Sequence, residues 1–185
     1  MPEGNLNVVW RVPGEERSVI VKYAPPYIAA DPDTSLDPSR LTIEARCLEA
    51  LGPNGMLADL RRASVRAPRP IDVNEADHVL VMEDLGDLPT LGRWLQNTDP
   101  DTVQEWAPTL GTELGAFIGD LHAATYDDEA CAETFDNRPM QETRHAVQYQ
   151  GVADMLAAGG VSDAKELGAR TEALGEALLD RKSVV

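Results

Sequence analysis

The stretch Ser18-Val19-Ile20-Val21-Lys22 has the apolar, β-branched composition of a strand, and it ends in a lysine. Glu44 follows on a segment in which Leu41 and Leu48 lie at helical spacing on the same face. An ammonium or a carboxylate in such a place is costly unless it has a partner of opposite charge. We therefore expect a helix packed on a sheet, with a Lys22–Glu44 ion pair near the seam.

Each of the two charges alone also fits a plainer account. The long side chain of Lys22 can extend to water while its stem stays on the sheet. A slight rotation of the helix would bring Glu44 to solvent at the edge of the helix. Only the two residues together favour the ion pair.

The flanking segments predict a small strand-rich unit followed by helices, which is an α+β fold class. Strands are expected at 6–12, 18–23, 71–73 and 78–82, and the first two form an antiparallel hairpin around the turn at 13–16. A polar loop at 31–38 leads to a helix that is capped by Asp37 and Pro38 and stopped by Gly52. Further helices are expected at 90–96, 102–124, 140–158 and 163–179. The predicted domains are residues 1–83 and residues 84–185.

The composition limits the class of partner. The chain has 185 residues, 43% of them hydrophobic, and a formal net charge of −16. That charge disfavours nucleic acid and anionic membranes, because both require a basic surface. We expect no signal peptide at the start of this sequence, and no apolar run reaches the roughly 20 residues that span a bilayer. Its two cysteines lack metal-ligand spacing, so we expect reduced thiols and a cytoplasmic protein.

Two further segments are candidates for ligand contacts. A glycine in Gly4-Asn5-Leu6-Asn7 would let the backbone approach a phosphate closely, although the segment by itself favours an ordinary N-terminal tail with a turn residue. The crossing Val81-Met82-Glu83-Asp84-Leu85-Gly86 could pair free backbone groups with an adenine edge, or could be a simple linker. Neither a dinucleotide-binding fingerprint nor a Walker A loop is present, and no Ser/His/Asp or Cys/His grouping supports nucleophilic catalysis.

Several segments together resemble the aminoglycoside phosphotransferase/choline kinase superfamily, and within it methylthioribose kinase and its fungal relatives. The most specific is the strand-lysine segment with its Pro25-Pro26 tail. The others are Gly4 to Asn7, Ile43-Glu44-Ala45, Val79 to Leu85, and the helical segment Leu114 to His122. The resemblance covers most of the chain and implies a protein-kinase-like fold, with a small antiparallel-sheet N-lobe and an incomplete helical C-lobe.

The resemblance also implies roles for single residues. Gly4, Asn5 and Asn7 would belong to the loop that covers the phosphates. Lys22 would hold the α- and β-phosphates of ATP, and Glu44 would orient Lys22. Met82, Glu83 and Leu85 would form the adenine-binding hinge. The reaction would transfer the γ-phosphoryl group to a hydroxyl of a small-molecule substrate, with Mg²⁺ neutralising charge.

The chain departs from the pattern of such kinases in one respect. They need a catalytic aspartate in a loop and a second, metal-binding aspartate, and none of His78, His122 and His145 is followed by such an aspartate. We therefore expect a kinase fragment with little or no turnover and without its own metal ligands. Uncovered apolar helix faces would favour oligomers or aggregation. Two alternatives stay open: a pseudokinase-like nucleotide-binding module, and an acidic interaction protein.

Overall fold

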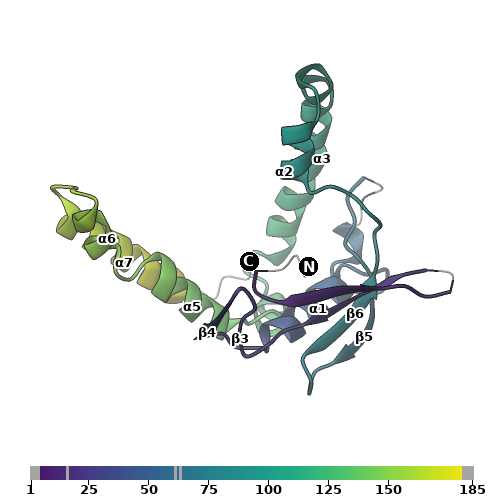
Figure 1. Ribbon diagram of the computed structural model, residues 1–185, viewed down its shortest axis with the longest axis horizontal. Helices are drawn as coiled ribbons and strands as arrows, with labels where there is room; N and C mark the ends of the chain where they lie inside the picture. Colours follow the sequence, from purple (N-terminus) through teal and green to yellow (C-terminus); the bar gives the residue numbers. More distant parts are fainter. Residues whose placement is uncertain (1–4, 16, 61, 63, 181–185) are drawn as a thin grey trace.

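The computed structural model describes residues 5–15, 17–60, 62 and 64–180. Its centre is a four-stranded antiparallel sheet in the order β1-β2-β6-β5. The strands are β1 (Val8–Val12), β2 (Val19–Tyr23), β5 (Pro70–Asn74) and β6 (Val79–Glu83). The chain is thus mixed α and β, as expected; among the described residues, every strand lies before residue 84 and the regular elements after it are helices (Figure 1).

The pairing of β2 decides which side chains share a face with Lys22. In the two ladders, Lys22 lies opposite Val9 of β1 and Leu80 of β6. Directly opposed residues of an antiparallel pair point to the same face. Lys22 therefore projects from a face that is otherwise apolar at this level.

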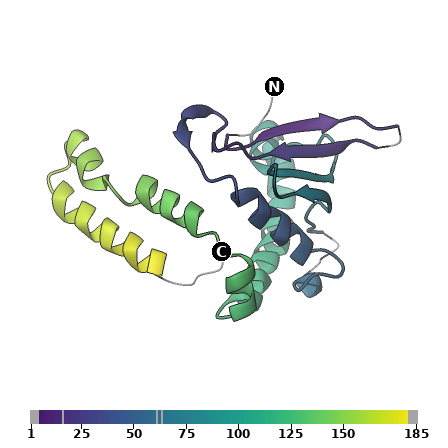
Figure 2. The same ribbon diagram turned by 90° about the horizontal axis from the view of Figure 1, so that it is seen from below.

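Helix α1 (Arg40–Ala50) covers that face of the sheet (Figure 2). Leu80 of β6, Ala24 directly after β2, and Leu41 and Ala45 of α1 form a fully buried cluster, each at most 2% exposed. Small residues at 24 and 45 let the helix approach the sheet closely. The register that brings these side chains together also brings Glu44 towards Lys22.

A second cluster joins the far end of α1 to the helical part of the chain. It contains Ala50 of α1, Leu57, Cys131 of α4 (Glu129–Thr134) and Phe135, all buried. The short helix η1 (Ala58–Leu60) lies beside it, and Leu121 from α3 (Pro100–Thr125) packs against it. Helix α1 therefore has both the sheet and the helices as neighbours.

The remaining helices extend away from this centre. Helix α2 (Leu91–Asn97) and α3 point in one direction, whereas α5 (Arg138–Gln148), α6 (Val152–Ala158) and α7 (Ala164–Asp180) form an arm in another (Figures 1 and 2). Contacts between α6 and α7 hold the arm together. Many apolar side chains on these helices stay exposed, including Trp106 at 50% and Leu174 at 56%.

Three expectations from the sequence were wrong in detail. The helix expected at 140–158 is two helices, because Gly151 adopts a left-handed φ of 72° and breaks it. Helix α4 was not expected. The loop expected at 31–38 contains strand β4 (Asp31–Ser35), which pairs with β3 (Tyr27–Ile28). This pair is a separate two-stranded sheet. Pro32, which has no N–H to donate, is tolerated there because β4 is not a central strand.

Helix α1 also begins later than predicted. Asp37 Oδ1 accepts a hydrogen bond from the Ser39 N–H at 2.8 Å, as a capping carboxylate does. The residues after it first form tight i→i+3 bonds, Leu41 N–H to Pro38 and Thr42 N–H to Ser39. The regular helix starts only at Arg40. The hydrogen bond from Ser39 holds the pKa of Asp37 below its ordinary value.

Candidate nucleotide site

The ion pair predicted between strand and helix is present. Lys22 Nζ lies 2.6 Å from both Glu44 Oε1 and Glu44 Oε2, so the ammonium is shared between the two oxygens. The two side chains are 19% and 33% exposed, so one side of the pair faces solvent. A pair that is neither fully buried nor fully solvated holds the lysine in place and leaves it within reach of an anion.

A pocket of about 420 Å³ opens beside this pair. The N-terminal segment forms one wall through Asn5, Leu6 and Asn7, and Asn137 and Met140 come from the start of α5. The volume lies in the range of small-molecule sites, about 300–1,000 Å³. The structure thus brings together four of the residues singled out from the sequence. Gly4, also predicted to take part, lies outside the described residues.

Arg40 is the residue of this pocket that the sequence analysis missed. It is 6% exposed, and its guanidinium is surrounded by acceptors. Nε donates to Asn7 Oδ1 at 3.0 Å, and the terminal nitrogens donate to the carbonyls of Leu6, Pro25, Leu36 and Asp37 at 2.7–3.4 Å. Burial lowers the pKa of Arg40, although an arginine keeps its proton in proteins. Its place four residues before Glu44, on the same side of the helix, was the available signal.

The crossing after β6 is held by a network of its own. Asp84 accepts from Ser18 Oγ at 2.5 Å and pairs with Arg11 Nε at 2.8 Å. Arg11 also donates to the Gly86 carbonyl at 2.8 Å. These contacts fasten the crossing to the ends of β1 and β2.

The three hinge candidates lie along this crossing in different environments. The Met82 side chain packs against the buried cluster under α1. Glu83 pairs with Arg66 at 3.0 Å, and Leu85 is 37% exposed. Hydrogen bonds from Arg66 and from the Arg69 backbone hold the pKa of Glu83 low. Among the residues that the structure describes, none of the three lines the Lys22 pocket.

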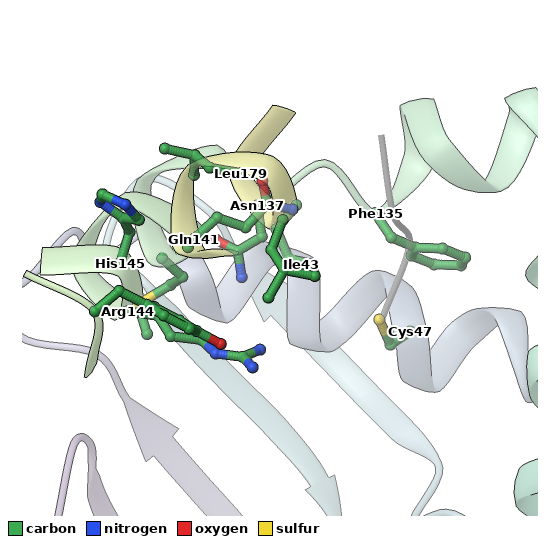
Figure 3. Close-up of a pocket in the computed structure, with 12 residues that line it drawn as sticks. Ile43, Cys47, Phe135, Asn137, Gln141, Arg144, His145 and Leu179 are labelled. Carbon is green, nitrogen blue, oxygen red and sulfur yellow. The ribbon is translucent and has the colours of Figure 1, made fainter. Parts of the chain in front are cut away.

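A second, larger pocket of about 590 Å³ lies between α1 and the α5–α7 arm (Figure 3). Apolar side chains such as Ile43 and Phe135 line it together with Gln141, Arg144 and His145. Asn137 and Met140 belong to both pockets, so the two share a wall. Buried atoms Asn137 Oδ1 and His145 Nε2 have no hydrogen-bond partner within the described structure. The lining suits an apolar group that also carries a hydrogen-bond donor.

The cysteines and carboxylates offer no separate chemistry. Burial raises the pKa of both Cys47 and Cys131, which keeps them as thiols rather than nucleophilic thiolates. Within the ranges that the structure describes, no three His, Cys, Asp or Glu side chains are grouped as a metal site would require. None of the helices described has the length and apolarity that crossing a membrane requires.

Comparison with known proteins supports a kinase-like assignment at a coarse level. No family model matches the chain. Two curated proteins named 4-hydroxytryptamine kinase are similar to it over 167 residues, at 26% identity for that of Psilocybe cyanescens and 25% for that of Psilocybe cubensis. The match covers 86% of this chain and 46% of each relative, so the chain spans a little less than half their length. This similarity fits a kinase-like family.

Proposed function

We propose that this chain carries the nucleotide-binding part of a small-molecule kinase of the aminoglycoside phosphotransferase/choline kinase type. Residues 1–83 would be its N-lobe and residues 84–185 part of its helical C-lobe. The observation that carries the proposal is the Lys22–Glu44 pair at the wall of a pocket. Similarity to proteins named as kinases supports it independently.

In this proposal the pair acts through position and charge. Glu44 fixes the Lys22 ammonium from the helix side, and the open side of the ammonium would face the α- and β-phosphates of ATP. The segment Gly4 to Asn7 would cover the phosphates, and the backbone from Met82 to Leu85 would pair with adenine. The pocket size and the cationic wall fit a triphosphate.

Group transfer would follow the chemistry common to such enzymes. The γ-phosphoryl group would pass in line to a hydroxyl of a small-molecule acceptor. Mg²⁺ would accompany ATP, but the described residues of this chain offer no cluster to hold it, so no step here runs through a metal bound by this chain. Little turnover by these residues alone stays a prediction, as does the alternative of a nucleotide-binding module without catalysis.

Thermal unfolding in the presence of ATP tests the proposal. At an ATP concentration a hundredfold above the dissociation constant, binding to the folded state adds about 2.7 kcal/mol of stability. We expect the wild-type chain to show a corresponding rise in Tm. Lys22→Ala should abolish the rise, because it removes the ammonium that would contact the phosphates.

Lys165→Ala is the matched control. Lys165 lies exposed on α7, and its substitution changes the net charge by the same amount. It should keep the full ATP-dependent rise. A wild-type Tm that does not respond to ATP would refute the proposed function. An equal loss of the ATP-dependent rise in Lys22→Ala and Lys165→Ala would show that overall charge, rather than the position of Lys22, causes the rise.

A further inference from the structure

Arg40 connects three parts of the chain that are far apart in sequence. Its guanidinium contacts Leu6 and Asn7 before β1, Pro25 after β2, and Leu36 and Asp37 before α1. We propose that Arg40 is a positioning residue that holds the segment 5–7 over the phosphate side of the Lys22 pocket. This inference rests on the proposed function for its link to phosphate.

The hydrogen-bond count excludes a direct role for Arg40 with phosphate. A guanidinium has five N–H donors. Nε makes one bond, and each terminal nitrogen makes two, so every donor has a protein acceptor. A phosphate could be bound by Arg40 only at the cost of one of these bonds. The residue therefore acts on a ligand through the backbone it holds.

The segment that Arg40 holds is fixed from the opposite side as well. The Leu6 carbonyl accepts from Arg40 at 2.9 Å and from the Ala29 N–H at 3.4 Å, and the Asn5 carbonyl accepts from the Ala30 N–H at 3.0 Å. Asn5, Leu6 and Asn7 all line the pocket that contains Lys22. Arg40 lines the same pocket and, with Ala29 and Ala30, holds these residues in position.

Only an arginine can fill this place. The acceptors in contact with it are four carbonyls and one side-chain amide oxygen, arranged around a planar fork. A lysine has three donors at one point and could not reach them all. Loss of the guanidinium would leave the buried Pro25 and Leu36 carbonyls without this donor, and the segment 5–7 would lose its hydrogen bonds to α1.

Two variants on the same helix provide the test. Arg40→Met removes the donors, and Arg46→Met makes the same charge change at an exposed arginine that only approaches Glu75 at 4.0 Å. We expect Arg40→Met to weaken ATP binding by about tenfold, the effect of a segment 5–7 that adopts its held position only about a tenth of the time. Adenosine, which has no phosphates, should bind both variants and the wild type equally. A general loss of structure would instead weaken the binding of ATP and of adenosine together.

Hydrogen exchange gives a second readout that needs no nucleotide. The amides of Ala29 and Ala30 donate to the held segment, so they report its opening. Arg40→Met should speed their exchange by about tenfold relative to Arg46→Met. Asn7→Ala, which removes one acceptor only, should produce a smaller change in the same direction and serves if Arg40→Met does not fold.

The two readouts separate this inference from the proposed function. Unchanged exchange at Ala29 and Ala30 in the Arg40→Met or Asn7→Ala chain would overturn the positioning role whether or not ATP binds. Faster exchange with an unchanged ratio of ATP to adenosine affinity would overturn the link to phosphate. Failure of the wild-type chain to bind ATP would refute the proposed function, and that link with it.

Discussion

At Asp84, donors from three residues converge on one carboxylate where the sheet gives way to helices. Ser18 Oγ, the Arg11 guanidinium and the Gly86 N–H all contact it, and its side chain is 6% exposed. The hydrogen bond from Ser18, then those from Gly86 and Arg11, hold the pKa of Asp84 below its ordinary value. Stability from this network is therefore present above the unfolded-state pKa and is lost as the pH falls through the lower folded-state pKa.

Replacing Asp84 with Asn tests that dependence on pH. We expect Asp84→Asn to lower the Tm at pH 7, because the donors of Arg11 then face an amide. The difference from wild type should shrink below about pH 4, where Asp84 in the unfolded wild-type chain begins to take up a proton that the folded chain still excludes. Thermal unfolding followed by circular dichroism from pH 7 to pH 3 measures it.

Asp87→Asn is the control for Asp84→Asn. The Asp87 side chain is fully exposed and lies 3.6 Å from Arg11. Its substitution removes the same charge and should change the Tm little at any pH. A gap between Asp84→Asn and wild type that stays constant down to pH 3 would contradict the assignment.

The elements show how much of the fold can be predicted from local sequence. The hairpin of β1 and β2, the pairing of β5 and β6, and helices α1 and α3 follow from apolar periodicity and turn residues that lie within each segment. The break at Gly151 depends on one backbone angle, and a single glycine within a predicted helix does not determine that angle. The pair β3 and β4 has no apolar pattern, so it could not be expected.

The site residues also divide into those that local sequence predicts and those that it does not. The Lys22–Glu44 pair could be predicted, because both charges interrupt apolar faces and so require a partner. The spacing of Arg40 from Glu44 gave its side of the helix but not its role, because its acceptors, Asn7 Oδ1 and four backbone carbonyls, are brought together only by the folded chain. The second pocket depends on how α5 and α7 lie against α1, which no local pattern determines. The roles given to the Met82 to Leu85 backbone stay predictions.

Leu80, a fully buried residue of the central strand β6, packs in the cluster that joins the sheet to helix α1. We expect this packing to stabilise the folded chain. Leu80→Ala removes a side chain that packs between Ala24 and Leu41, and should cost about 2–5 kcal/mol of unfolding free energy. Leu88→Ala, at a side chain that is 74% exposed, should cost less than about 0.5 kcal/mol. Urea unfolding measures both. Equal losses in the two variants would show that the sheet and α1 do not form the stable core.

The molecule as a whole is acidic, whereas the Lys22 pocket contains two cationic side chains. The net charge is −16, yet the Lys22 pocket has Lys22 and Arg40 in its wall. An acidic chain can bind a polyanion only where a cation is held locally, and here Glu44 holds the Lys22 ammonium, whereas every Arg40 donor already has a protein acceptor. Helix α3 exposes a row of apolar side chains, Trp106, Leu110, Leu114 and Ile118. Such a row favours self-association, which stays a prediction.

The central claim is that Lys22 faces the phosphates of ATP, and affinity labelling tests it most directly. The probe is ATP whose γ-phosphate carries a reactive acyl group. A lysine amine beside the phosphates attacks the acyl carbonyl, an amide forms and ATP leaves. Mass spectrometry then compares Lys22 with the exposed Lys165 within one chain.

We predict that Lys22 is labelled faster than Lys165, although it is the less exposed of the two, because only bound probe can place the acyl group beside it. Excess ATP should suppress labelling at Lys22 and leave Lys165 unchanged. Labelling of Lys22 that is no faster than that of Lys165, or that ATP does not suppress, would contradict the account.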